Sequence, residues 1–324
     1  MTRVVVVGEL DAEGILTKLS MEVATLARTL GDAAGAEVVG VIHGGRSTGD
    51  GAATELGRFV PAVLIEDRLG TSPRAVDIAA ALSTMVTADD VVLLPASPNG
   101  RDVAGTLSGL AGLAALTNAT GTRWSDDGPI VEMSAFGGKL ITESAFTSGR
   151  GIITVRPNAV TAVPREGPAA TVGATERAAI PAQPAVQLVE QVAEEASAVS
   201  IDDARIIVSG GRGVGSADGF ALVQDLANEL GGAVGATRAA VDSGWIPYAQ
   251  QIGQTGKIVK PQLYLALGIS GAIQHKVGMQ TAGTIIAVNR DPDAPIAGFA
   301  DMFVVGDLFE VGPALLAALR ARRG

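Results

Sequence analysis

Short apolar runs alternate with stretches of helical periodicity in the first part of the chain, and this alternation restricts the fold more than any other feature. The apolar runs, typical of buried strands, lie at 4–7, 37–43, 62–65 and 91–95. Helices are predicted between them and beyond them, over 20–30, 73–86 and 99–116. Because parallel strands need crossover connections of this length, the pattern predicts a parallel sheet with helices on both faces.

The rhythm changes after residue 122. Three short alternating segments at 130–136, 138–144 and 151–156 are bounded by glycine, which predicts an antiparallel hairpin added to the parallel sheet. The composition then shifts to alanine, proline, glycine and threonine over 164–184, which indicates an extended connector.

A second alternating region runs to the C-terminus. Its predicted strands lie at 204–208, 263–267, 284–288 and 302–305. We therefore predict an α/β fold of two domains, each a mainly parallel sheet flanked by helices, with the hairpin in the N-terminal one. The boundary is placed near residue 195, which gives domains at 1–195 and 196–324.

Composition excludes several classes of site. The 24 lysines and arginines are outnumbered by 34 aspartates and glutamates, and a net charge of −10 argues against a nucleic-acid partner. The chain has no cysteine and only two histidines, so thiolate and multi-histidine metal sites are not expected. No apolar run is long enough to span a membrane, and the strand at 4–7 is too short for a secretory segment. We expect a soluble, cytoplasmic protein.

A glycine-rich turn follows the strand at 204–208. The sequence SGGRGVG at 209–215 precedes a helix predicted over 217–230, and such a turn lets backbone N–H groups approach a phosphate. Ser216 stands where the common dinucleotide motif needs its last glycine. A second segment, GQTGK at 253–257, fails as a nucleoside-triphosphate loop because Ile258 and Gln251 occupy two of its required positions.

Further polar turns follow the next predicted strands. Ser270 is predicted to cap a helix that begins at Gly271, with His275 one turn inside it. Asn289 and Asp307 follow the two last strands, where parallel sheets bind ligands. Together the turns indicate a dinucleotide with phosphates and an aromatic head group. His43, at the end of a strand, is interpreted as structural.

Four of these segments resemble one known family. VGATRAAVD at 234–242, GQTGK at 253–257, SGAIQH at 270–275 and NRDP at 289–292 are similar to the alpha subunit of electron-transfer flavoprotein, in the same order. The resemblance covers residues 204–318, and the N-terminal half resembles the family in architecture.

The resemblance implies an FAD-binding C-terminal domain and an N-terminal domain that associates with a beta subunit. It implies an electron carrier of fatty acid β-oxidation with no substrate turnover of its own. Such carriers accept electrons from acyl-CoA dehydrogenases and pass them to a membrane quinone oxidoreductase. The expected FAD contacts are Arg212, Thr237, Arg238, Ile252, Gly253, Gln254, Thr255, Gly256, Ser270, Gly271, Ala272, Ile273, Gln274, His275, Asn289, Asp307 and Leu308.

Individual roles follow from the same resemblance. Thr237 replaces the family's serine but keeps its hydroxyl, and the Thr255 hydroxyl is expected to reach N5 of the flavin ring. Asn289 and the Asp307–Leu308 pair are expected at the adenosine end. Arg238, His275 and the helix start at Ser270 are expected to stabilise the negative charge of the reduced ring.

Three alternatives stay open at this point. A flavin-bifurcating member of the family would pair with a beta subunit that carries a second FAD. A self-contained NAD(P)-binding oxidoreductase would need an acidic residue at the end of the strand after the glycine turn, and the chain lacks it there. A flavin-free binding subunit would use its glycine turns only for structure.

Overall fold

The structure is a computed structural model that describes residues 2–44, 46–69, 73–135, 140–175, 179–181, 201 and 204–323. The chain divides into two compact units, residues 1–187 and 188–324, and each is described by itself. The domain boundary predicted near residue 195 lies outside the described residues.

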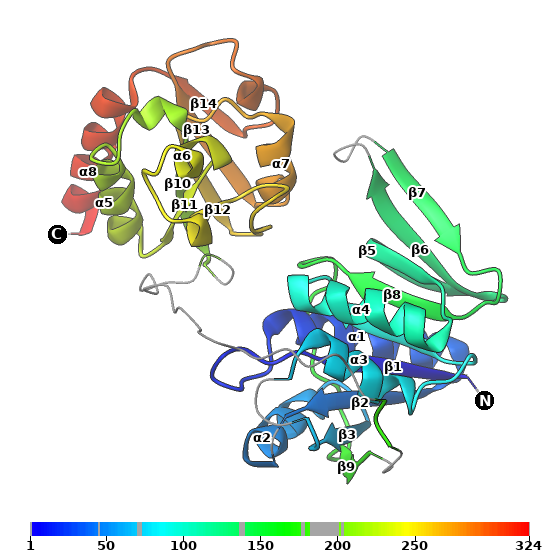
Figure 1. Cartoon of the computed structure of the whole chain (residues 1–324). Coiled ribbons are helices and arrows are strands. Elements are labelled where there is room, and N and C mark those ends of the chain that lie inside the picture. Colours follow the sequence, from blue (N-terminus) through cyan, green and yellow to red (C-terminus); the bar gives the residue numbers. More distant parts are fainter. Residues whose placement is uncertain are drawn as a thin grey trace. The chain divides into compact units, whose positions relative to one another are not determined.

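The N-terminal unit is built on the predicted parallel strands. They are β1 (Arg3–Gly8), β2 (Glu37–His43), β3 (Ala62–Glu66) and β4 (Val91–Pro95), all mutually parallel where they pair. The helices are α1 (Lys18–Ala34), α2 (Arg46–Leu56), α3 (Ala75–Ser83) and α4 (Pro98–Ala111). Apolar side chains of α1 and α2 pack on one face of the sheet, and those of α3 and α4 pack on the other (Figure 1). The predicted α/β architecture is confirmed.

The middle of this unit differs from the prediction. The helix expected to reach residue 116 ends at Gly112, whose φ of 67° is left-handed, and β5 (Ala115–Ser125) follows it. β8 (Gly151–Val155) is not part of an antiparallel hairpin, since it is fully buried and runs parallel between β4 and β5. In the segment predicted as a connector, β9 (Thr171–Ala174) pairs with β3.

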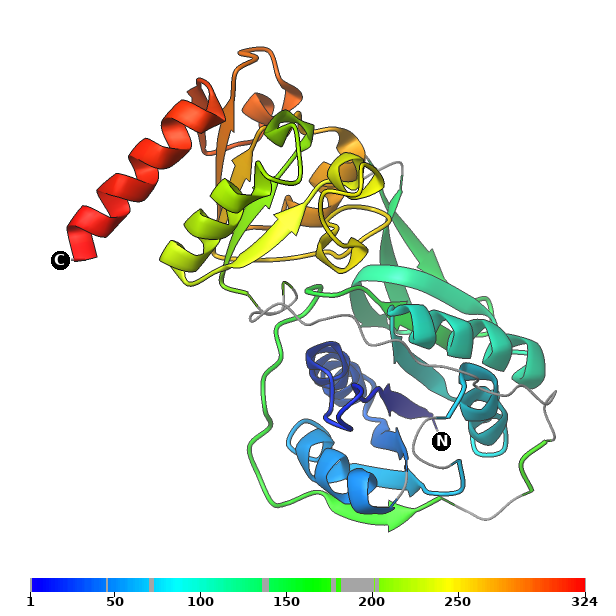
Figure 2. The same cartoon turned by 60° about the vertical axis from the view of Figure 1, so that its left-hand side comes forward.

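The predicted antiparallel addition is present at one end of the sheet. β6 (Gly128–Ala135) pairs antiparallel with β5 and with β7 (Leu140–Ala145). The nine strands lie in the order β7-β6-β5-β8-β4-β1-β2-β3-β9 (Figure 1). Figure 2 shows the same unit from a second direction. Three strands, β6, β5 and β8, therefore lie between the outer edge strand β7 and the four strands that the sequence predicted first.

The C-terminal unit is a five-stranded parallel sheet in the order β11-β10-β12-β13-β14 (Figure 1). The strands are β10 (Ile206–Gly210), β11 (Ala233–Ala236), β12 (Leu263–Leu267), β13 (Thr284–Asn289) and β14 (Met302–Val305). The helices are α5 (Phe220–Leu230), α6 (Arg238–Asp242), α7 (Ile273–Met279) and α8 (Leu308–Arg323), with 3-10 turns η2 (Arg212–Val214), η3 (Tyr248–Gln250) and η4 (Pro295–Gly298). α5 and α8 pack on one face, and α7 and η4 on the other.

The strand order places a ligand-binding position in this sheet. From β10 the chain first crosses to β11 on one side, and then to β12 on the other side of β10. Open parallel sheets bind ligands where the order reverses in this way, outside the carboxyl ends of the strands. In the C-terminal unit this position lies beyond Gly210 and Leu267.

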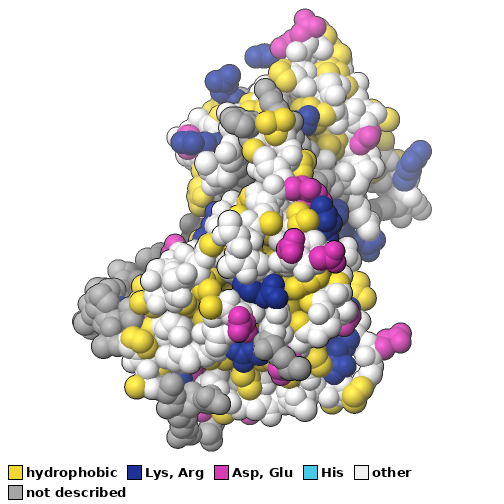
Figure 3. Space-filling view, turned by 90° about the vertical axis from the view of Figure 1, so that its right-hand side faces the viewer, with side chains coloured by type: hydrophobic (Ala, Val, Ile, Leu, Met, Phe, Trp, Pro, Cys, Tyr) yellow, Lys and Arg dark blue, Asp and Glu magenta, His cyan; other side chains and the backbone are white. Residues whose placement is uncertain are grey.

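The surface carries charges of both signs. On the face shown in Figure 3, basic and acidic side chains are interspersed rather than gathered into one basic patch. In the part of the chain that the structure describes, none of the helices combines the length and the hydrophobicity of a membrane-spanning segment.

Candidate functional site

Two glycine turns pack backbone against backbone at the strand-order reversal. Gly211 N–H donates to the Leu267 carbonyl at 2.9 Å, and Gly213 N–H donates to the Gly268 carbonyl at 3.0 Å. A Cβ atom on Gly213 would lie 2.7 Å from the Cα atom of Gly268. Only glycine fits this contact, so the turns after β10 and β12 form one narrow backbone cradle.

Thr237 supplies an unused hydroxyl next to this cradle. Its backbone N–H donates to the carbonyl of Gly210 at 3.0 Å, which joins the end of β11 to the end of β10. Its Oγ1 atom is buried and has no hydrogen-bond partner among the described residues, and neither has Oε1 of Gln250. Buried polar atoms are rarely left unpaired, so these two atoms and the glycine cradle fit a polar ligand such as a dinucleotide.

The two segments expected around the flavin ring are bound to each other. Gln254 N–H donates to the Gln274 carbonyl at 2.7 Å, and a Cβ atom on Gly253 would lie 2.9 Å from the same oxygen. Ile252 N–H donates to Ala236 at 2.9 Å, which ties this loop to the end of β11. The structure therefore brings residues 252–256 and 270–275 together at the carboxyl edge of the sheet.

His275 is held by the protein at both ring nitrogens. Nδ1 lies 3.0 Å from the carbonyl oxygen of Ile252, and Nε2 lies 2.9 Å from the hydroxyl of Tyr264. A carbonyl oxygen can only accept, so Nδ1 carries the hydrogen and Nε2 accepts from Tyr264. Burial lowers the pKa of His275 to about 4. Both ring nitrogens are bonded within the protein and the ring is neutral at neutral pH, so the expected stabilisation of the reduced flavin by His275 stays a prediction.

Ser270 does not cap a helix as predicted. Gly271 has a left-handed φ of 82°, so α7 begins only at Ile273, and its cap residue Ala272 makes no side-chain bond. The carbonyl of Ser270 instead accepts from the backbone of Ile296 at 3.0 Å. The helix start expected at Ser270 therefore lies at Ile273, and its contribution to the charge of the reduced ring stays a prediction.

The residues expected at the adenosine end lie beside the same cradle. Asn289 donates to the Ile269 carbonyl at 2.9 Å and accepts from the Asp291 backbone at 3.0 Å. Asp307 is exposed and accepts from the backbone of Phe309 at 2.8 Å, whereas Leu308 is buried. A Cβ atom on Gly268 would lie 2.8 Å from Leu308 Cδ2, so this leucine packs directly against the turn after β12.

The two arginines expected at the flavin are exposed. Arg212 lies in η2, immediately beside the glycine cradle. Arg238 begins α6 and its guanidinium forms an exposed ion pair with Asp242 at 3.2 Å. Exposed pairs of this spacing are worth only a few tenths of a kcal/mol, so Arg238 can turn to another anion at little cost.

Three residues that bond to expected site residues were given no role from the sequence. Tyr264 carries the one polar side-chain group in the apolar strand LYLAL, and this was the available signal for its bond to His275. Gln251 and Tyr248 both bond to Thr255, and no local pattern in the sequence marked them.

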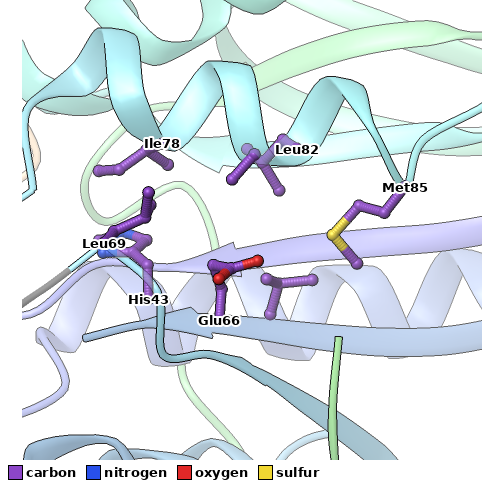
Figure 4. A pocket seen from close by; sticks show the side chains of 8 residues that line it. His43, Glu66, Leu69, Ile78, Leu82 and Met85 are labelled. Carbon is purple, nitrogen blue, oxygen red and sulfur yellow. The ribbon is translucent and has the colours of Figure 1, made fainter. Parts of the chain in front are cut away.

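The N-terminal unit has a small cavity beside His43. His43 and Glu66 face a space of about 10 Å³ under the aliphatic side chains of α3, which is room for no more than one water molecule (Figure 4). Burial lowers the pKa of His43 to about 4. Burial by itself would raise the pKa of Glu66, but its bonds to Arg68 and Thr175 outweigh this and lower it. The burial of His43 and the small size of this cavity are compatible with the structural role assigned to His43.

Comparison with known proteins identifies the family. The family model described as "Electron transfer flavoprotein domain" matches residues 4–200, and the one described as "Electron transfer flavoprotein FAD-binding domain" matches residues 200–280. The chain belongs to the electron transfer flavoprotein alpha-subunit family. It is 44% identical over 319 residues to the electron transfer flavoprotein subunit alpha of Mycobacterium leprae, covering 96% of each chain. It is also 44% identical over 326 residues to that of Mycobacterium tuberculosis, covering 100% of each, and 36% identical over 317 residues to Protein FixB of Clostridium saccharobutylicum, covering 94% of this chain and 92% of that one.

The match to the FAD-binding domain contains most of the site. Residues 200–280 include the glycine cradle, Thr237 and both loops that carry Ile252–Gly256 and Ser270–His275. The cofactor of this domain is FAD. The Thr237 hydroxyl, the glycine cradle and the exposed side chains of Arg212 and Arg238 fit the diphosphate, ribose and ring oxygens of FAD.

The buried state of His275 predicts a specific pH dependence of stability. Between pH 6.5 and about 4 the unfolded chain binds a proton at this residue and the native chain does not, so the free energy of unfolding falls as the pH falls. The full loss is about 3 kcal/mol. The measurement is urea unfolding of a Trp124→Phe protein, in which Trp245 alone reports on the C-terminal unit. A His275→Gln variant should lose less stability over this range, and parallel curves for the two proteins would contradict the assignment.

Proposed function

We propose that the chain is the FAD-carrying subunit of an electron-transferring heterodimer. The observation that carries this proposal is the backbone cradle of Gly211, Gly213 and Gly268 at the strand-order reversal, with the unpartnered hydroxyl of Thr237 beside it. The membership of an electron transfer flavoprotein family supports it. The partner is a beta subunit of the same family of proteins, and residues 1–195 serve that association.

Each group of residues has its own task in this proposal. Bound FAD supplies the chemistry, because its ring takes up and releases electrons. The cradle and Thr237 bind the middle of the cofactor, while Asn289, Asp307 and Leu308 lie at its adenosine end. Arg212 and Arg238 place positive charge beside the cofactor's anionic groups. Thr255 donates its hydroxyl hydrogen to the ring, and the neutral His275 fixes the position of the loop that carries it.

We further propose that electrons come from flavin dehydrogenases such as acyl-CoA dehydrogenases and leave to a membrane quinone oxidoreductase. The protein then acts in the cytoplasm as a carrier without substrate turnover. An NAD(P)-dependent enzyme is less well supported, since β11 ends at Ala236 followed by Thr237 and presents no carboxylate for a ribose.

One preparation tests the proposal. The chain co-expressed with its beta subunit should be yellow, and the flavin absorption should bleach when an acyl-CoA dehydrogenase and its acyl-CoA substrate are added. A colourless protein that FAD cannot reconstitute would contradict the cofactor assignment. A yellow protein that stays oxidised under these conditions would contradict the proposed electron donor.

A further inference from the structure

The loop that carries Thr255 is closed by its own backbone bonds. Lys257 N–H donates to the Gln251 carbonyl at 2.7 Å, and Gly253 N–H donates to the Lys257 carbonyl at 3.1 Å. A Cβ atom on Gly256 would lie 2.3 Å from the Gln251 carbonyl oxygen, so the return of the chain requires glycine there. Gln254 and Thr255 therefore form the exposed tip of a tightly closed loop.

Two side chains from before the loop hold Thr255 in place. Tyr248 donates its hydroxyl hydrogen to the Thr255 carbonyl at 2.6 Å. Gln251, whose side chain is buried with 3% of its surface exposed, donates from Nε2 to Oγ1 of Thr255 at 3.1 Å. Both the backbone and the hydroxyl of Thr255 are thus positioned before any ligand arrives.

The direction of the second bond decides what the hydroxyl can do. An amide nitrogen only donates, so Gln251 occupies a lone pair of the Thr255 oxygen and leaves its hydrogen available. Among the described residues, none accepts that hydrogen. The exposed hydroxyl is therefore fixed as a hydrogen-bond donor to whatever lies over the loop.

We infer that Gln251 is a positioning residue that makes Thr255 a hydrogen-bond donor to the bound flavin. This inference rests on the proposed function, which places the ring over Thr255. In the oxidised ring N5 has a lone pair and accepts a hydrogen bond. A donor held there favours electron uptake, because the hydrogen bond strengthens as negative charge develops on the ring.

Two replacements of Gln251 separate this role from simple packing. Gln251→Met keeps an unbranched side chain of similar length but removes the donor, so the Thr255 hydroxyl becomes free to rotate. Gln251→Glu keeps the shape and the hydrogen bond, but an ionised carboxylate only accepts and turns the Thr255 hydrogen away from the ring. If Gln251 served only to fill space, Gln251→Glu would change the flavin less than Gln251→Met does. If Gln251 orients the Thr255 hydroxyl, Gln251→Glu has the larger effect.

The test uses the full chain in complex with its beta subunit and measures the FAD dissociation constant and the flavin midpoint potential. Gln251→Met should weaken FAD binding about fivefold, which is typical for the loss of one neutral hydrogen bond, and should lower the potential. Gln251→Glu should lower the potential further at pH 8. Its difference from the wild type should shrink as the pH is lowered and the carboxyl group is protonated.

A double-mutant cycle with Thr255→Val tests whether Gln251 acts through the Thr255 hydroxyl. Once the Thr255 hydroxyl is absent, Gln251→Met should have no further effect on affinity or potential. Gln224→Met is the matched control, because the Gln224 side chain is exposed and, among the described residues, bonds to Asn228 on α5. If Gln251→Met lowered affinity and potential by the same amount with and without Thr255→Val, the inference would be overturned. The proposed function would not be affected by that result. If Thr255→Val changed nothing while FAD still bound, both the ring position and the inference would be overturned.

Discussion

Gly213→Ala is expected to weaken FAD binding about 100-fold and to lower the melting temperature of the C-terminal unit by roughly 10 °C. The added Cβ atom would lie 2.7 Å from the Cα atom and 2.9 Å from the carbonyl oxygen of Gly268. Both are backbone atoms at a residue with a left-handed φ, so neither turn can move without breaking the Gly213–Gly268 hydrogen bond. FAD titration and differential scanning calorimetry measure the two effects.

Gly298→Ala is the matched control for this substitution. It lies in the same unit, its φ is not positive, and a Cβ atom there has no neighbour within 4 Å. The control should bind FAD as the wild type does and melt within about 2 °C of it, since a compatible glycine-to-alanine change costs little. Equal behaviour of Gly213→Ala and Gly298→Ala would show that the cradle does not hold the cofactor.

Arg238→Ala is expected to lower the first reduction potential of the bound flavin while the fold survives. The arginine places a positive charge beside the ring in the proposed site, and its only described ion pair is the exposed one with Asp242. A loss of about 1.4 kcal/mol of charge stabilisation corresponds to about 59 mV in a one-electron potential. Spectroelectrochemical titration of the complex measures this shift, and less of the one-electron-reduced flavin should accumulate.

Arg320→Ala provides the comparison for the loss of one positive charge. Arg320 also forms an ion pair, from an exposed guanidinium to the partly buried Glu229, but it lies near the end of α8. Because α8 starts from the carboxyl edge of the sheet and runs back along it, Arg320 lies toward the opposite edge. Its removal should leave the potential unchanged within about 10 mV. Equal shifts for both variants would indicate a general charge effect rather than a local one.

Most strands of the two parallel cores, though not the short buried strand β11 (AVGA), could be predicted because they bury both faces. Such strands read as continuous aliphatic runs, as in β1 and β4, whose residues are almost all buried. β5 was missed because its sequence ALTNATGTRWS is polar and most of its residues are partly exposed. β9 was missed because its four exposed residues gain their structure from pairing with β3, far away in the sequence.

Within the site, the sequence predicted which segments meet but not how their side chains are bonded. The glycine turns were recognisable because backbone geometry requires them, and Thr237 was expected from the family resemblance. The orientation and tautomer of His275 depend on Tyr264 and on the Ile252 carbonyl, which lie 11 and 23 residues away in the sequence, and its lowered pKa follows from burial. The predicted helix start at Ser270 was wrong because Gly271 has a left-handed φ, and α7 begins only at Ile273. Interactions of this kind follow from tertiary packing and have no local signature.

The most direct measurement is a crystal structure of the chain with its beta subunit and FAD. We expect the cofactor along the carboxyl edge of β10, β12 and β13, with its central part on the glycine cradle and Thr255 Oγ1 within 3.5 Å of ring N5. FAD bound elsewhere on the complex, with that edge free of it, would contradict the account.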